Sequence, residues 1–203
     1  MVDDLTNKVS VIGIIGTLND SMVCRKLEGA WNGRVFTDLS LRDIIKLKRA
    51  EPAFGKAVYV VENPPVYSAI LDYWEGKDKI PAVICTSGNL KISAYRLIDT
   101  LVSSNPDLSI YFSADFDPEG ILMLQRLYDR HPSRVLPWRF SVNDYFKTNP
   151  IKEIETARRV NMLRNSMVPG MEATVEAIKN LGKVGYQEEL IVDLLGDLEQ
   201  SIQ

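Results

Sequence analysis

Histidine and cysteine are scarce in this 203-residue chain, which has one histidine, His131, and two cysteines, Cys24 and Cys85. One histidine makes a histidine-rich metal cluster or a histidine-dependent catalytic triad hard to build, so any hydrolytic chemistry would depend on carboxylates. The two cysteines are far apart in apolar stretches. They argue against a disulfide scaffold and favour a reducing compartment, so we expect a cytoplasmic protein.

Long apolar runs and a large excess of one charge are also missing. The longest early apolar run, residues 9–15, is too short to span a bilayer, and the N-terminus has no basic-then-apolar signal pattern. We therefore expect no membrane partner. The formal net charge of −3 argues against a generally basic nucleic-acid binder but allows a local basic patch.

From residue 57 onward, short β-prone runs alternate with helical patterns. The predicted strands and helices are, in chain order, 57–61, 66–74, 82–85, 92–101, 108–112, 120–130 and 134–136. This alternation predicts an α/β fold with a mainly parallel four-stranded sheet, right-handed crossovers and flanking helices.

The rest of the chain is expected to pack around this core. Residues 1–50 are predicted to be an N-terminal extension, 51–150 the core, and 151–203 a C-terminal helical part of the same domain. In the extension, residues 22–24 and 34–36 suggest a short antiparallel pair, and Ser40 with Asp43 suggests a capped helix start. The helices predicted after Pro150 are 151–164, 171–181 and 186–202.

Three carboxylates lie where the third predicted strand passes into its helix: Asp115, Asp117 and Glu119. Asp117, Pro118 and Glu119 are explained as an ordinary helix start, with Asp117 as N-cap and Pro118 at the first helical position. Asp115 is not explained in this way, because a lone buried carboxylate is costly. A hard cation such as Mg²⁺ would offset that cost, so a metal site is one of two open interpretations.

Glu62 has a matching position, directly after the strand 57–61. It is either a metal ligand or general acid/base, or part of a capping loop together with Asn63. If the first and third predicted strands are neighbours in the sheet, Glu62 converges with the acidic stretch at one edge, where ligands bind in α/β folds.

Two further features suit phosphate. The turn Thr86-Ser87-Gly88 follows the second predicted strand and either holds a phosphate on backbone amides or is simply a tight turn. The basic residues after the acidic stretch include Arg126 and Arg139. They either contact a phosphodiester backbone or form a solvated helical face.

The ordered motifs resemble the Toprim domain of topoisomerases, primases and related nucleases, and in particular the C-terminal Toprim-like domain of bacterial proteins akin to the nuclease subunit of the Wadjet anti-plasmid system. The stretch Asp115–Gly120 is similar to one in type IA topoisomerases and in the topoisomerase VI A subunit. The motifs that carry the resemblance are Val60-Val61-Glu62-Asn63-Pro64, Cys85-Thr86-Ser87-Gly88, Asp115-Phe116-Asp117-Pro118-Glu119-Gly120, Pro137-Trp138-Arg139-Phe140 and Tyr186-Gln187-Glu188-Glu189-Leu190.

This resemblance implies a Toprim fold with Mg²⁺ or Mn²⁺ held by Asp115 and Asp117, Glu119 as a further candidate ligand, and Glu62 as general acid/base or ligand. It also implies DNA as the substrate, with other subunits of a plasmid-defence or DNA-maintenance complex as partners. No separate domain with a nucleophilic tyrosine is visible, so strand passage is not expected from this chain alone.

The expected function is therefore metal-dependent cleavage of DNA phosphodiesters. The alternatives are a non-catalytic, metal-binding interaction domain of a DNA-processing complex and, third, a phosphate-ester hydrolase or nucleotide-binding domain acting on small molecules.

Overall fold

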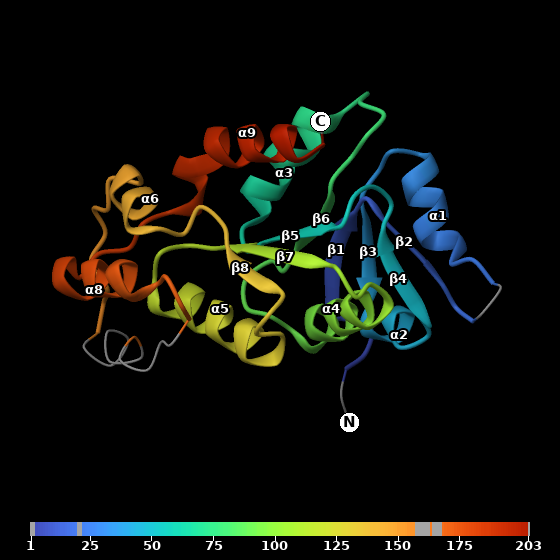
Figure 1. The fold of residues 1–203 in the computed structure, drawn as a ribbon, viewed down its shortest axis with the longest axis horizontal. Helices are drawn as coiled ribbons and strands as arrows, with labels where there is room; N and C mark the ends of the chain where they lie inside the picture. Colours follow the sequence, from blue (N-terminus) through green and yellow to red (C-terminus); the bar gives the residue numbers. More distant parts are fainter. Residues whose placement is uncertain (1–2, 20–21, 157–162, 164–167, 203) are drawn as a thin grey trace.

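A six-stranded sheet lies at the centre of the molecule, in the order β3-β1-β6-β5-β7-β8 (Figure 1). The computed structural model describes residues 3–19, 22–156, 163 and 168–202. The bounds of the six strands are β1 Lys8–Ile12, β3 Thr37–Ser40, β5 Ala57–Val61, β6 Ala82–Cys85, β7 Ser109–Ser113 and β8 Val135–Pro137.

Four of these strands are parallel neighbours, in the order β6-β5-β7-β8. The sequence-based predictions for β5 and β6 are confirmed at both ends, and β7 and β8 each begin one residue later than predicted. Both faces of β5 and β6 are covered, because the alternating residues Tyr59 and Val60 are both buried and so is every residue of β6. Continuous apolar runs of this kind are typical of parallel strands buried on both sides.

The sheet has six strands instead of the predicted four, because the first 40 residues add two strands to one edge. β1 pairs antiparallel with β6, and β3 pairs antiparallel with β1. The apolar run at residues 9–15 is divided by Gly13, whose φ of 68° is a left-handed conformation that favours glycine. As a result β1 joins the main sheet, whereas β2 (Ile14–Thr17) pairs with β4 (Arg49–Pro52) in a separate two-stranded sheet.

The predicted antiparallel pair around residues 22–36 is also wrong. Residues Arg25–Asn32 form helix α1, which buries Leu27, and Gly33 is its C-cap rather than a hairpin turn. This segment contains too few apolar residues for its helical period to be recognised in the sequence. The predicted helix start at Ser40 is confirmed: Ser40 and Asp43 form a complete capping box at helix α2 (Leu41–Ile44).

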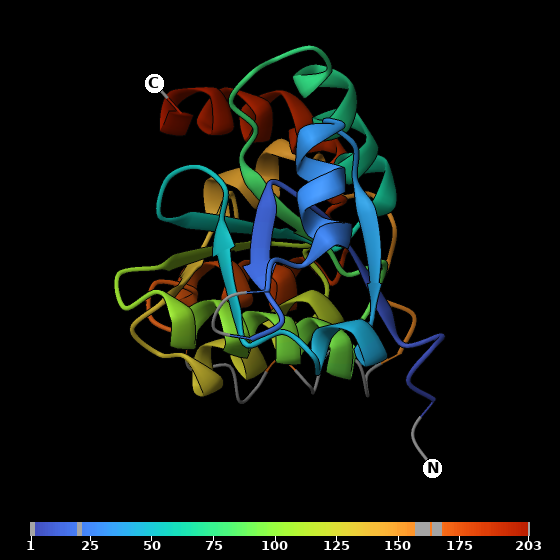
Figure 2. The same cartoon turned by 90° about the vertical axis from the view of Figure 1, so that its right-hand side faces the viewer.

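Helices cover both faces of the sheet (Figures 1 and 2). Helices α3 (Pro64–Trp74) and α9 (Ile191–Ile202) lie on one face, and α2, α4 (Ile92–Ser104) and α5 (Pro118–Arg130) lie on the other. Helix α3 leads from β5 to β6 on one side of β5, and α4, on the opposite face, leads from β6 to β7 on the other side of β5. The order of the strands therefore reverses between β5 and β7. None of the helices in the described ranges is long and apolar enough to cross a membrane.

The C-terminal part agrees with the sequence only in places. Helix α8 (Glu172–Leu181) is confirmed to within one residue, and the segment predicted as 186–202 is a 3₁₀ turn, η2 (Gln187–Leu190), followed by α9. Of the predicted helix 151–164, residues 151–156 are not helical, and the rest lies almost entirely outside the described residues. Backbone bonds explain the non-helical part, since Ile154 donates to Gly182 and Lys152 accepts from Val184.

A second helix, like α1, was not predicted. Helix α6 (Val142–Lys147) begins with a capping box formed by Ser141 and Asp144, a signal that the sequence does contain.

Candidate functional site

The candidate site lies at the carboxyl ends of β5 and β7, which are adjacent and parallel with Val61 opposite Ser113. Glu62 directly follows β5, and Asp115 lies two residues beyond β7. The condition for convergence is therefore met: the backbone N–H of Asp115 donates to Glu62 Oε2 at 3.4 Å. In open α/β sheets the crevice where the strand order reverses is the usual ligand site, and here that crevice is the β5–β7 edge.

Asp115 is held by the chain on two sides. Its Oδ1 accepts hydrogen bonds from Asn63 Nδ2 at 2.7 Å and from the backbone N–H of Gln187 at 2.8 Å. Burial raises the pKa of Asp115, and the negative charge of Glu188 adds to that rise, while the bonds from Gln187 and Asn63 oppose it. The two hydrogen bonds therefore fix the orientation of the Asp115 carboxylate, while burial makes its negative charge costly.

Glu62 is the most perturbed acid of the site. Burial is the main reason that its pKa is raised to about 7, and the negative charges of Asp115, Asp117 and Glu119 raise it further. The hydrogen bond from Asp115 opposes the rise. A carboxyl group with a pKa near neutrality can both take up and release a proton at physiological pH, which is the property of a general acid or base.

The structure confirms the helix-start interpretation of Asp117. Its Oδ1 accepts from the backbone N–H of Gly120 at 2.8 Å, so it is the N-cap of α5 with Pro118 in the first turn. A carboxylate has further lone pairs after one capping bond, so the capping role leaves room for a second role in the site.

Gly120 is required by the close approach of the helix to the strand end. A Cβ atom at this position would lie 2.1 Å from the carbonyl oxygen of Asp115. The motif Asp115–Gly120 therefore combines a cap, a helix start and a glycine that lets α5 begin directly against the site.

Asn63, Gln187 and Glu188 contact the acids of the site, and the sequence did not place them there. Asn63 makes no capping bond to α3; its amide instead bridges Asp115 Oδ1 and, at 3.3 Å, Glu188 Oε2. Phe116 and Gly185 exchange backbone hydrogen bonds, which brings η2 to the acidic stretch. The position of Asn63 next to Glu62 was a usable signal, whereas nothing local connects Gln187 to an acid 72 positions earlier.

The turn Thr86-Ser87-Gly88 lies beside the acids, but part of its hydrogen-bonding capacity is already used. The backbone N–H of Thr86 donates to Val61 and that of Gly88 donates to Glu62. Ser87 and Gly88 both have positive φ, and Thr86 Oγ1 closes the turn on the Gly88 carbonyl at 2.6 Å. These bonds connect the turn after β6 to the backbone of Val61 and Glu62, so these two amides are already used within the chain and do not point to a phosphate.

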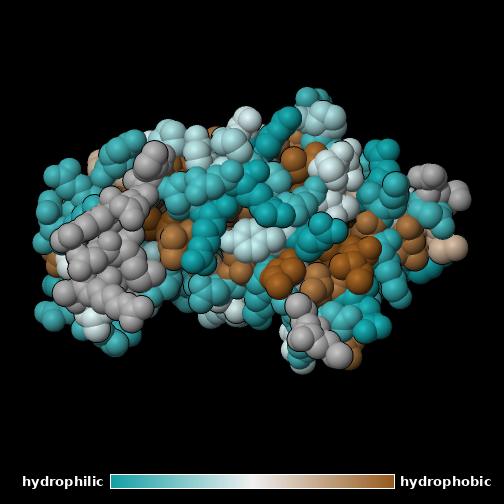
Figure 3. All heavy atoms as spheres, turned by 90° about the horizontal axis from the view of Figure 1, so that it is seen from below, coloured by the Kyte–Doolittle hydropathy of each residue, from teal (hydrophilic) through white to brown (hydrophobic). Residues whose placement is uncertain are grey.

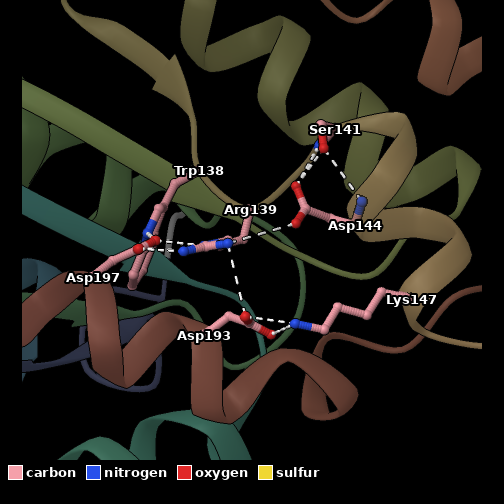
Figure 4. Close-up of polar contacts among 7 residues, drawn as sticks. All are labelled: Trp138, Arg139, Ser141, Asp144, Lys147, Asp193 and Asp197. Carbon is pink, nitrogen blue, oxygen red and sulfur yellow. Dashed lines mark hydrogen bonds and ion pairs between the residues drawn. The ribbon is translucent and has the colours of Figure 1, made fainter.

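Arg139 is engaged in a network on the C-terminal helix (Figure 4). Its Nε donates to Asp197 Oδ2 at 2.6 Å, and Asp193 and Asp144 lie within ion-pair distance. Trp138 Nε1 donates to the same Asp197 carboxylate at 2.9 Å. This network anchors α9 and neutralises the charge of Arg139, which leaves it poorly suited to a phosphate. Arg126 lies on the exposed face of α5.

The acids suit a hard cation by chemistry. Their donors are all carboxylate oxygens, which Mg²⁺ and Mn²⁺ prefer, and burial together with neighbouring carboxylates raises the pKa values of Glu62 and Asp115, an environment that a bound cation would stabilise. Within the described part of the chain, no three His, Cys, Asp or Glu side chains are arranged so that they could hold a metal ion by themselves. An ion bound by one or two carboxylates, with water and phosphate oxygens as its other ligands, needs no such group.

The raised pKa of Glu62 predicts a specific pH dependence of stability in metal-free buffer. Between its ordinary value of 4.5 and its folded value of about 7, the folded chain holds more protons than the unfolded chain. The free energy of unfolding therefore falls as pH rises through this interval, and the loss is complete above it. Glu62→Gln removes the loss, so we expect this variant to be more stable than the wild type by about 3 kcal/mol at pH 8.

Urea unfolding in EDTA at pH 8 and pH 4.5 measures this effect, and the difference should vanish at the lower pH. Glu51→Gln, which alters an exposed glutamate on β4, is the matched control and should change little at either pH. If Glu62→Gln is less stable than the wild type at pH 8, the fold does not disfavour the ionised form of Glu62, and this prediction is wrong.

Comparison with protein families gives a match. Residues 37–198 match the family described as "Protein of unknown function C-terminus (DUF2399)". The chain has no match among curated proteins. The family match includes β5, β7, the acidic stretch and η2, and so contains every acid of the site described above. Because the match spans most of its length, this chain belongs to the DUF2399 C-terminal domain family.

Proposed function

We propose that this chain cleaves DNA phosphodiesters with the help of Mg²⁺ or Mn²⁺, through a Toprim-like centre at the β5–β7 edge. The observation that carries the proposal is the convergence of Glu62 and Asp115 at the point where the strand order of the parallel sheet reverses. The ordered motifs that resemble Toprim domains of Wadjet-type nuclease subunits support it. The mainly parallel sheet with helices on both faces is compatible with a Toprim arrangement.

In this proposal each acid has a defined task. Asp115 and Asp117 would hold the metal ion, with Glu119 as a further ligand, and Asn63 and the Gln187 amide keep the Asp115 carboxylate oriented. A bound Mg²⁺ or Mn²⁺ would polarise the phosphate and offset the charge that develops during cleavage. Glu62, next to the metal ligands, would accept a proton from the attacking water as general base.

The proposal includes the setting of the activity. The substrate is DNA, and the partners are other subunits of a plasmid-defence or DNA-maintenance complex. A cytoplasmic location is part of it, since both cysteines are free and buried.

A second candidate, a non-catalytic interaction domain, is favoured by one observation. The Asp115 carboxylate already ties the end of β7 to η2 through the Gln187 amide, so the acids have a structural use without any reaction.

Incubation of the purified chain with supercoiled plasmid separates the two candidates. We expect nicked or linear product in Mg²⁺ or Mn²⁺ and none in EDTA. Failure of the chain to cleave under all these conditions, while either ion still raises its melting temperature, would overturn the nuclease proposal in favour of the interaction domain.

A further inference from the structure

A groove of about 370 Å³ opens between α4 and α5, and none of the acids of the candidate site lines it. It is lined by Ile92, Tyr95, Arg96, Arg126 and Arg130. Figure 3 views the molecule from the side of these helices, and this face is mostly hydrophilic with apolar side chains between. The groove thus combines three arginines with an aromatic ring, although the net charge of the chain is −3.

The positive charge of the groove is only partly neutralised. Arg130 is paired with Asp99, to which its Nε and Nη2 donate at 2.6 Å each, and His131 contacts the same carboxylate. Arg96 and Arg126 are exposed, and neither forms an ion pair with a carboxylate among the residues that the structure describes. Two guanidinium groups thus face the groove with their charge uncompensated.

The apolar part of the groove lies between these charges. Tyr95 is half-buried, with the Arg130 guanidinium 5.7 Å from its ring centroid, and Ile92 is 47% exposed. Arginine forks match phosphate oxygens in pairs, and aromatic or apolar surfaces accept sugars and bases. A peptide of acidic residues alone would satisfy the arginines but would leave the ring and Ile92 without a matching group.

The position of the groove connects it to the site. Helix α4 begins at Ile92, four residues after the turn that is bonded to Glu62, and α5 begins directly after its cap Asp117. Arg126 is nine residues beyond Asp117, about 13 Å along the helix axis. That length corresponds to about four phosphates along one strand of a duplex.

We propose that the α4–α5 groove binds the phosphodiester backbone of DNA that leads to the acidic site. The identity of the ligand rests on the proposed function, but binding by the groove does not require cleavage.

Fluorescence anisotropy with a labelled 30-base-pair duplex, in EDTA so that no metal-dependent cleavage occurs, tests the groove directly. We expect Arg96→Ala/Arg126→Ala to weaken binding by about 10- to 100-fold near 0.1 M salt. We also expect the slope of log K against log salt to become shallower by about 2, because two phosphate contacts are lost. Lys48→Ala/Lys152→Ala removes two exposed charges outside the groove and should leave both quantities nearly unchanged.

The variant Arg96→Lys/Arg126→Lys preserves the charge and keeps most of the salt slope, but it loses the paired hydrogen bonds. Its affinity for the duplex should therefore lie between those of the wild type and Arg96→Ala/Arg126→Ala. If the wild type and Arg96→Ala/Arg126→Ala bind the duplex with equal affinity, the proposal that the groove binds DNA is overturned. Tighter binding of polyglutamate than of the duplex to the wild type would also overturn it, because this assigns the groove to an acidic protein. If the groove variants lose binding but no form of the chain cleaves DNA, the groove stands and the nuclease proposal fails.

Discussion

Asp115→Asn is expected to lower metal-dependent cleavage by at least about 100-fold without unfolding the chain. The asparagine retains a side-chain oxygen in place of Oδ1, so the hydrogen bonds from Asn63 and from the Gln187 amide have an acceptor. What disappears is the negative charge that would hold the cation. Cleavage of supercoiled plasmid in Mn²⁺ at fixed enzyme concentration measures the loss.

Stability and metal binding separate this effect from simple misfolding. In EDTA the variant should melt at or above the wild-type temperature at pH 7.5, because burial and Glu188 disfavour the charge of Asp115. The rise in melting temperature caused by Mg²⁺ or Mn²⁺ should be reduced.

Asp107→Asn is the matched control for this experiment. Asp107 precedes the opposite end of β7, and its side chain is 76% exposed. We expect wild-type cleavage and a wild-type response to metal from this variant. If Asp115→Asn cleaves plasmid as fast as the wild type, the acids do not form the catalytic centre, and the activity belongs elsewhere in the chain or to a contaminant.

Gly120→Ala is expected to destabilise the fold by about 1–3 kcal/mol, although alanine normally favours a helix over glycine. The added Cβ would meet the backbone carbonyl oxygen of Asp115 at 2.1 Å and the Cβ of Ala114 at 3.3 Å. Because the closest atom is backbone, the strand end or the start of α5 must shift. Thermal or urea unfolding in EDTA checks the sign and size of the change.

Gly196→Ala provides a control in another helix of the same chain. Gly196 lies inside α9, and a Cβ there would meet no atom within 4 Å. Helix propensity alone then applies, so we expect a gain of up to about 1 kcal/mol. Stabilisation by both substitutions would show that α5 does not need a glycine against the strand end.

Gly120→Ala should also affect function beyond its cost in stability. A shift of Asp115 by a fraction of an ångström displaces one acid relative to Glu62, and misplacement of about 1 Å at a reacting centre can cost on the order of 100-fold in rate. Cleavage measured well below the melting temperature of the variant isolates this contribution. Full activity at that temperature would show that Asp115 keeps its position.

Local sequence signals were sufficient for much of the fold. Runs of β-branched residues predict β5 and β6 at their observed bounds, and Asp117-Pro118 predicts the start of α5, because propensity, burial and capping act over a few residues. The same signals failed at α1, where few apolar residues show the helical period. They also failed at residues 151–156, whose backbone pairs with the segment after α8.

The candidate site depended on the tertiary structure to a greater degree. The sequence named Glu62, Asp115 and Asp117 as candidates, but only the crossover order makes β5 and β7 neighbours and brings Glu62 beside Asp115. The contacts of Asp115 with Gln187, and of Arg139 with Asp197, join segments separated by 72 and 58 positions. Such contacts follow from how the helices pack on the sheet, and short-range spacing carries no information about that packing.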